Sequence, residues 1–237
     1  RVRAADVAAT LVRLTAPHAP GENTEIYSTW GSPDYATCHV IFLGDATALM
    51  RSSDGGQSFA PALAGSAGNA RYAVVPGCSG AGGTIYVGNL NGLYKSVNGG
   101  QAFSLVSLPA SCSSAAAPAI QGIAVSPNYA LDQTSYVAST VNGAAGGLCK
   151  SVNGGASWAQ VLNGGTLITG PIAISPVYNE AGASGPAKTL MINSLRTTDG
   201  GATWAAASGC SIRGISGGLF SPLYAPGSTV LLFGDGI

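Results

Sequence analysis

The sequence has few charged residues, few histidines and no long apolar run. Of its 237 residues, 10 are Lys or Arg, 10 are Asp or Glu and 2 are His, so the formal net charge is zero and charged residues make up 8% of the chain. Phosphate binding requires a clustered basic face, so this composition argues against a nucleic-acid partner. The lack of a long apolar run argues against a membrane span, and the scarcity of Glu and Lys excludes a coiled coil.

Signatures of metal binding and of nucleophilic catalysis are also scarce. The five cysteines form no CxxC pair, and only two histidines accompany them, which argues against a zinc site. The chain has no GxSxG motif, and its Gly-rich segments follow no strand-to-helix pattern, so neither a Ser/His/Asp triad nor a phosphate loop is predicted. We therefore predict no cofactor and no metal. Calcium held by Asp or Asn turns is the alternative, although each loop offers only one or two carboxylate ligands.

The cysteines favour an oxidising compartment, because five of them occur in a chain of low charge. We therefore predict a secreted protein that is extracellular or in the cell envelope. The first disulfide that we predict joins Cys78 to Cys112. The alternative is that all five cysteines are buried thiols, since free cysteine is often interior.

A nine-residue segment recurs four times without gaps, and we call it the box. Its copies are RSSDGGQSF (51–59), KSVNGGQAF (95–103), KSVNGGASW (150–158) and RTTDGGATW (196–204). The Asp or Asn at the fourth position recurs at intervals of 44, 55 and 46 residues. One blade of a β-propeller has about this length, so the spacing predicts one box in each blade.

The residue types of the box are those of a tight turn. Asp or Asn accepts hydrogen bonds from N–H groups two residues on, and Gly-Gly supplies the positive φ that a hairpin requires. The aromatic residue is expected to pack into the blade. The residues with a predicted structural role are the Asp or Asn, the second Gly and the aromatic of each box: Asp54, Gly56, Phe59, Asn98, Gly100, Phe103, Asn153, Gly155, Trp158, Asp199, Gly201 and Trp204.

A second element precedes each box. It reads SPDY (32–35), SPNY (126–129), SPVY (175–178) and SPLY (221–224), with VVPGC (74–78) as a degenerate copy. A short apolar, β-prone run separates the two elements, so each unit is predicted as four strands, with SPxY ending the first and the box following the third.

The fold class that we predict is all-β: a β-propeller of four-stranded antiparallel blades, with four complete blades and a partial fifth. It spans residues 26–237, and residues 1–25 are a separate N-terminal segment that forms a strand or a short helix. We expect the parent chain to continue beyond this sequence. The alternatives are that the N-terminal segment completes the last blade or that another chain fills its open edge.

These repeats resemble the BNR or Asp-box repeat of β-propellers. The pattern occurs in sialidases, in xyloglucan-degrading glycoside hydrolases, in Vps10-type sorting receptors and in photosystem II assembly factors. SPNYALDQT (126–134) is similar in style to bacterial extracellular BNR-repeat proteins. The resemblance covers roughly residues 30–237 and implies the propeller fold, whereas it names almost nothing about activity.

The charged residues do not assemble an obvious active site. A sialidase needs three arginines, but only Arg71 and Arg213 lie near the innermost strands. A glycosidase needs two carboxylates about 5–10 Å apart, and no pair stands out. We therefore predict no catalytic residue. The candidate binding residues, on inner strands and in the loops between the first and second strands, are Arg71, Gln121, Arg213, Asp34 and Asp132.

The function predicted from the sequence is a non-enzymatic extracellular or envelope scaffold. Its partners would be proteins or further copies of itself, with glycans as a further option, because a neutral, rigid surface suits contact more than chemistry. One alternative is a sialidase- or xyloglucanase-like glycoside hydrolase with catalytic residues partly outside this segment. A second alternative is a photosystem-type assembly factor, against which the paucity of basic residues counts.

Overall fold

The computed structural model describes residues 26, 28–32, 35–44, 48–64, 71–74, 83–112, 118–141, 144–163, 168, 170–207, 215–220 and 230–234. For residues 71–74, 141, 144–145, 215–219 and 230–234 the description is limited to the backbone. The N-terminal segment 1–25 lies outside the described residues, so the predicted domain boundary is not tested.

Among the described residues, eighteen strands form five antiparallel sheets in chain order, and four of these sheets have four strands. We call these four sheets blades 1 to 4. Blade 1 consists of β1 (Ser28–Gly31), β2 (Ile41–Gly44), β3 (Ala48–Ser52) and β4 (Ala60–Ala64). Blade 2 consists of β5 (Arg71–Val74), β6 (Ile85–Asn89), β7 (Gly92–Ser96) and β8 (Ser104–Val106). Blade 3 consists of β9 (Ala119–Val125), β10 (Ser135–Val141), β11 (Ala144–Ser151) and β12 (Ala159–Asn163). Blade 4 consists of β13 (Ile172–Ile174), β14 (Leu190–Ile192), β15 (Leu195–Thr197) and β16 (Ala205–Ala206).

A fifth repeat contributes a two-stranded sheet of β17 (Ile215–Phe220) and β18 (Val230–Gly234). The prediction of four complete blades and a partial fifth is therefore confirmed. The part of the chain that the structure describes also has three short helices that were not predicted: α1 (Tyr35–Cys38), α2 (Tyr129–Asp132) and the 3-10 helix η1 (Pro186–Lys188). Each is a single turn between the first and second strands of a blade, too short to show helical periodicity in the sequence.

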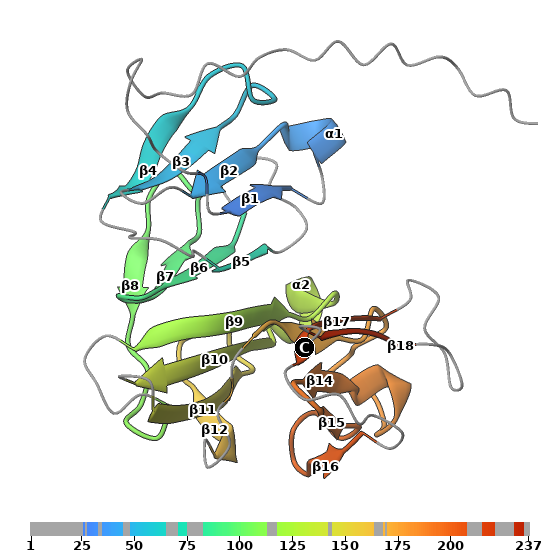
Figure 1. The fold of residues 1–237 in the computed structure, drawn as a ribbon. Helices are drawn as coiled ribbons and strands as arrows, with labels where there is room; N and C mark the ends of the chain where they lie inside the picture. The colour runs from blue at the N-terminus through green and yellow to red at the C-terminus, as the bar shows by residue number, and fades with distance from the viewer. Residues whose placement is uncertain are drawn as a thin grey trace, which may run out of the picture.

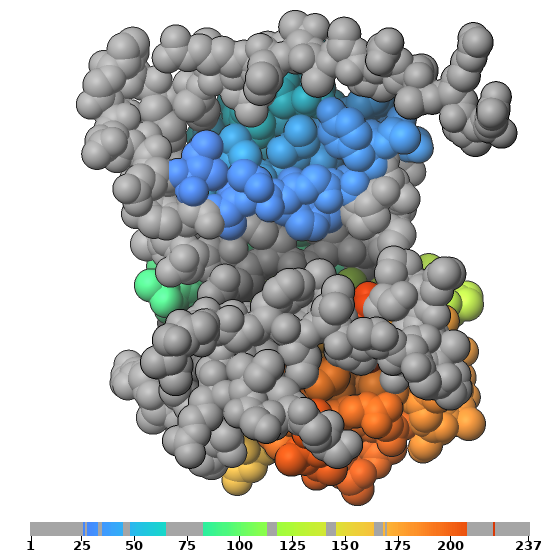
Figure 2. All heavy atoms as spheres, turned by 45° about the vertical axis from the view of Figure 1, so that its right-hand side comes forward, coloured from blue at the N-terminus to red at the C-terminus, as the bar shows by residue number. Residues whose placement is uncertain are grey.

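The blades follow one another along a curved path. Figure 1 shows blade 1 at one end, blades 2 and 3 next to it in turn, and β17–β18 beside blade 4. The first strands β5, β9, β13 and β17 contact each other in succession, which makes them the inner strands of the arc. Figure 2 shows blade 1 in blue and blade 4 in orange at opposite ends of the visible face.

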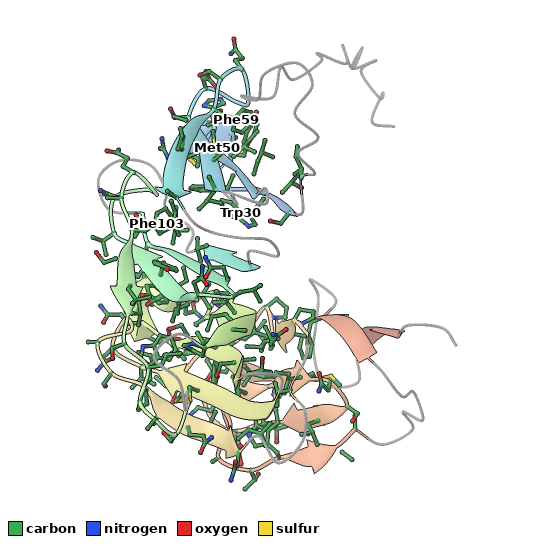
Figure 3. All side chains as sticks on the ribbon, turned by 60° about the vertical axis from the view of Figure 1, so that its left-hand side comes forward. Trp30, Met50, Phe59 and Phe103 are labelled. Atoms are coloured by element: carbon green, nitrogen blue, oxygen red, sulfur yellow. A yellow bond between two sulfur atoms is a disulfide. The ribbon has the colours of Figure 1, made fainter. Side chains whose placement is uncertain are left out.

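The hydrophobic core lies between successive blades. Phe42 and Leu49 of blade 1 pack against Ile85 and Val87 of blade 2, and all four side chains are buried. Phe103, the aromatic residue of the second box, packs against this cluster, and Figure 3 shows it where the first two blades meet. The sequence predicted that the box aromatic packs into its own blade. Phe103 contacts a cluster that contains residues of both its own blade and the preceding one, because each sheet buries one face against its neighbour.

Candidate functional site: the box face

The box folds as a hydrogen-bonded turn around its Ser or Thr and its Asp or Asn. In blade 1 the Ser52 hydroxyl donates to Oδ1 of Asp54 at 2.7 Å and accepts the N–H group of Gly56 at 2.8 Å. Oδ1 of Asp54 also accepts the N–H groups of Gln57 and Ser58, at 2.9 and 3.0 Å. The backbone donors to Asp54 therefore lie three and four residues on, rather than two as predicted, because the N–H group two residues on, that of Gly56, is bonded to the Ser52 hydroxyl instead.

The same turn recurs in the other boxes. The hydroxyl donates to Oδ1 at 2.8, 3.0 and 2.6 Å in the pairs Ser96–Asn98, Ser151–Asn153 and Thr197–Asp199. Asn keeps the accepting oxygen of Asp, so the two boxes with Asn form the same turn around an uncharged side chain. Sequence spacing found this turn, but the central role of the Ser or Thr hydroxyl was missed, although its place two residues before the Asp or Asn was visible in all four copies.

The same hydrogen bonds shift the pKa of the two box aspartates. Bonds from Ser58 and Ser52 hold the pKa of Asp54 well below its usual value of 3.8. Bonds from Thr197 and Thr203 hold the pKa of Asp199 well below the same value. Each carboxylate is therefore bonded more favourably when it is ionised.

Unfolding measured at several pH values should detect the contribution of these two carboxylates to the stability of the folded protein. A carboxylate whose pKa falls on folding stabilises the folded state above the unfolded pKa of 3.8 and loses that contribution as the pH drops further. Asp54→Asn combined with Asp199→Asn should therefore unfold with a flatter pH dependence than the wild type below pH 3.8. The measurement is the urea midpoint between about pH 5 and about pH 2. Parallel curves for the two proteins would contradict the shifts.

The first residue of each of the first three boxes bonds the next box. Arg51 Nε donates to the carbonyl oxygen of Gly99 at 2.8 Å, and Lys95 Nζ donates to that of Gly154 at 2.7 Å. Lys150 Nζ reaches the carbonyl oxygen of Gly200 at 3.2 Å. The acceptor is always the first glycine of the following box. Burial lowers the pKa of Arg51 and Lys95, as expected for cations held between blades. These basic residues therefore connect neighbouring blades.

Pairs of tyrosines join the same blades a second time. The hydroxyl groups of Tyr86 and Tyr129 lie 2.9 Å apart, and those of Tyr136 and Tyr178 lie 2.6 Å apart. The first tyrosine of each pair is on the second strand of one blade, and the other belongs to the SPxY element of the next. Blade 2 has the degenerate VVPGC in place of SPxY, and the second strand of blade 1 carries Phe42 instead of tyrosine. The interface between blades 1 and 2 therefore lacks both tyrosine hydroxyl groups of the pair.

Tyr178 and Glu180 form a pair of the kind that a sialidase nucleophile would need. The Tyr178 hydroxyl donates to Oε2 of Glu180 at 2.5 Å, and Lys150 Nζ lies 2.7 Å from Oε1. Tyr178 is fully buried, however, and burial raises its pKa, which opposes the phenolate that a nucleophile requires. The pair therefore holds blade 4 to blade 3.

The candidate binding residues are not brought together. Asp132 lies in α2, where Oδ2 accepts the Ser126 hydroxyl at 2.7 Å and the Glu180 N–H group at 3.2 Å, so it is engaged in loop structure. Gln121 lies on the inner strand β9 and donates to the Thr140 hydroxyl at 3.1 Å. Arg71 is the first residue of β5, with only its backbone described. Asp34 and Arg213 lie outside the described residues.

The predicted disulfide is wrong, because Cys112 is bonded to Cys149 and not to Cys78. Cys112 follows β8 in the link from blade 2 to blade 3, and Cys149 lies in β11 of blade 3, with 5.9 Å between the two Cα atoms. Cys78 lies outside the described residues. Cys38 is also disulfide-bonded.

Within the described part of the chain, no group of three or more His, Cys, Asp or Glu side chains could hold a metal ion. Among the same residues, no helix is both long enough and apolar enough to cross a membrane. Neither finding tests the predictions about cofactors and partners.

Four consecutive four-stranded antiparallel blades define a β-propeller. The solved structures that are similar to this chain include two GH74 enzymes. The chain is similar to an ancestral GH74 enzyme, with a TM-score of 0.63 and 21% identity over 84% of this chain and 26% of that one. It also matches the GH74 xyloglucanase from Xanthomonas campestris, with a TM-score of 0.45 and 21% identity over 71% of this chain and 28% of that one. The chain thus spans about a quarter of the length of either enzyme. No family model and no curated protein matches the sequence.

Proposed function

We propose that this chain forms part of a carbohydrate-active propeller of the glycoside hydrolase type. The observation that supports this proposal is the fold shared with the ancestral GH74 enzyme over 84% of the chain. The composition agrees with it, since a chain with only 8% charged residues suits a neutral polysaccharide better than a charged one.

The catalytic carboxylates of such an enzyme would lie outside the described residues. Hydrolysis needs two carboxylates flanking the glycosidic bond, one of them free to exchange a proton. The four described carboxylates, Asp54, Asp132, Glu180 and Asp199, all accept hydrogen bonds within turns or between blades. The acids that remain are Asp6, Glu22, Glu25, Asp34, Asp45 and Asp235. Asp45 and Asp235 follow the second strand of their repeats, in FLGD and LFGD, and are the first to test.

A second candidate function is the non-enzymatic scaffold. It is favoured by the hydrogen bonds that all four described carboxylates accept within turns or between blades. On this hypothesis the propeller holds protein or glycan partners without chemistry. An extracellular or envelope location fits both functions, since the Cys112–Cys149 disulfide persists in an oxidising compartment. The photosystem-type assembly factor stays a prediction from the resemblance alone.

Xyloglucan, a neutral polysaccharide, can separate the two functions. A hydrolase should release reducing ends, and Asp45→Asn or Asp235→Asn should lower that rate by about 100-fold or more if the residue is a general acid or base. Asp54→Asn is the matched control, because Asn already fills this position in two boxes. A scaffold that holds glycans should retain xyloglucan in affinity electrophoresis without releasing reducing ends. A protein that neither binds nor cleaves it contradicts the carbohydrate proposal.

A further inference from the structure

The boxes of blades 2 and 3 contain a chemically reactive dipeptide, an asparagine followed by a glycine. These are Asn98–Gly99 and Asn153–Gly154. Asparagine is thermolabile, above all before glycine, which has no Cβ atom to hinder its own backbone nitrogen. The lone pair of that nitrogen attacks Cγ of the asparagine, a C–N bond forms, and the side-chain nitrogen leaves as ammonia with the proton of the glycine N–H group. Water then opens the cyclic imide at either carbonyl carbon and yields aspartate or isoaspartate.

The folded box holds both of the groups that would react. The N–H group of Gly99 donates to the carbonyl oxygen of Gly83 at 2.9 Å, and that of Gly154 donates to the carbonyl oxygen of Gln133 at 3.0 Å. Oδ1 of each asparagine accepts the hydroxyl two residues before it and the N–H group four residues after it. Ring closure requires these hydrogen bonds to break, so the reaction has to wait for a local opening of the blade.

The two boxes differ in how firmly they hold the asparagine side chain. Both begin with the same residues, KSVNGG, so the two asparagines have the same immediate sequence context. In blade 3, Nδ2 of Asn153 also donates to the Ser157 hydroxyl at 2.8 Å. In blade 2 the residue at that position of the box is Ala102, which has no hydroxyl group to accept such a bond. The side chain of Asn98 therefore lacks one restraint that Asn153 has.

The loops that bond the two glycines are also held differently. Gln133, which accepts the N–H group of Gly154, lies in the loop that carries Tyr129, and the Tyr129 hydroxyl lies 2.9 Å from that of Tyr86 in the preceding blade. The loop before Gly83 contains VVPGC, which has no tyrosine. The box of blade 2 therefore has fewer hydrogen bonds to break before it opens than the box of blade 3.

We propose that Asn98 is a site of spontaneous deamidation that the folded box controls, and that Asn153 reacts in the same way but more slowly. The aspartate product keeps the turn, because Asp54 and Asp199 form it in the other two boxes. The isoaspartate product adds a methylene group to the main chain, so the hydrogen bonds of the turn cannot all form again. Either product adds one negative charge to a chain whose net charge is zero. This modification does not depend on the function proposed above.

Peptide mapping by mass spectrometry, after incubation at mildly alkaline pH, measures the deamidation rate at each asparagine separately. In urea, Asn98 and Asn153 should react at the same rate, because their sequence context is the same. In the folded protein both should react more slowly than in urea. Asn98 should then react about 2- to 10-fold faster than Asn153, which is the factor that one net intramolecular hydrogen bond supplies.

Two reciprocal variants provide the sharper readout. Ala102→Ser supplies the missing hydroxyl and should slow deamidation of Asn98, whereas Ser157→Ala removes it and should accelerate deamidation of Asn153, each by about 2- to 10-fold. Both side chains are exposed, and each variant is the control for the other, since it should leave the rate in the other box unchanged. Equal rates at the two asparagines of the folded protein overturn the proposal, as do rates as fast as those in urea. An Asn98 rate that Ala102→Ser does not change overturns it as well.

Discussion

Replacing Gly100 with alanine should lower the free energy of unfolding by about 2–5 kcal/mol. Gly100 has a φ of 79°, a left-handed conformation that costs an L-residue about 1–2 kcal/mol. A Cβ atom at this position would also lie 2.4 Å from Cζ of Phe42, a fully buried ring of the preceding blade. Moving that ring disturbs the core between blades 1 and 2, which adds about 1–3 kcal/mol.

A second glycine separates the two contributions. Gly154 has a φ of 68°, close to that of Gly100, but a Cβ atom there would meet its nearest atom, the Tyr129 hydroxyl oxygen, only at the ordinary contact distance of 3.4 Å. Gly154→Ala should therefore show the backbone cost without the loss of core packing. The measurement is urea unfolding followed by both tryptophan fluorescence and circular dichroism. Equal losses for Gly100→Ala and Gly154→Ala would contradict the role assigned to the Phe42 contact.

Removing the Cys112–Cys149 disulfide should lower the free energy of unfolding by about 2–4 kcal/mol. The bond joins residues 37 apart in sequence, so it restricts a substantial loop of the unfolded chain. It also fixes the link between blades 2 and 3 to strand β11, and the Ser139 hydroxyl of the neighbouring strand β10 donates to the carbonyl oxygen of Cys112. The variant to test is Cys112→Ala combined with Cys149→Ala, again by urea unfolding.

Single variants provide the control for this experiment. Either Cys112→Ala or Cys149→Ala alone removes the cross-link, so each should cost nearly as much as the double variant. Losses that simply add would show that packing of the two buried side chains, and not the cross-link, accounts for the effect. A double variant as stable as the wild type would contradict the stabilising role of the bond.

The repeated boxes were predictable because each box is a local structure. Within the turn, the Ser52 hydroxyl and the Asp54 carboxylate form hydrogen bonds with groups at most four residues away. The nine residues of a box therefore contain nearly all of the hydrogen bonds that form the turn. The strands between boxes followed from short apolar runs bounded by turn residues. The candidate binding residues were less predictable. Asp132 and Gln121 were selected by their places in the repeat, whereas their partners were fixed by the folded blades.

The scarcity of charge, the four boxes and the SPxY elements determined by themselves that the chain folds into four blades and part of a fifth. The tertiary structure alone decided what joins one blade to the next. Lys95 reaches the carbonyl oxygen of Gly154, 59 residues away, and Tyr136 meets Tyr178, 42 residues away. Likewise, the disulfide joins Cys112 to Cys149, 37 residues away. A repeated sequence offers several equivalent partners at such separations, and only the stacking of one sheet on the next brings a particular pair within bonding distance.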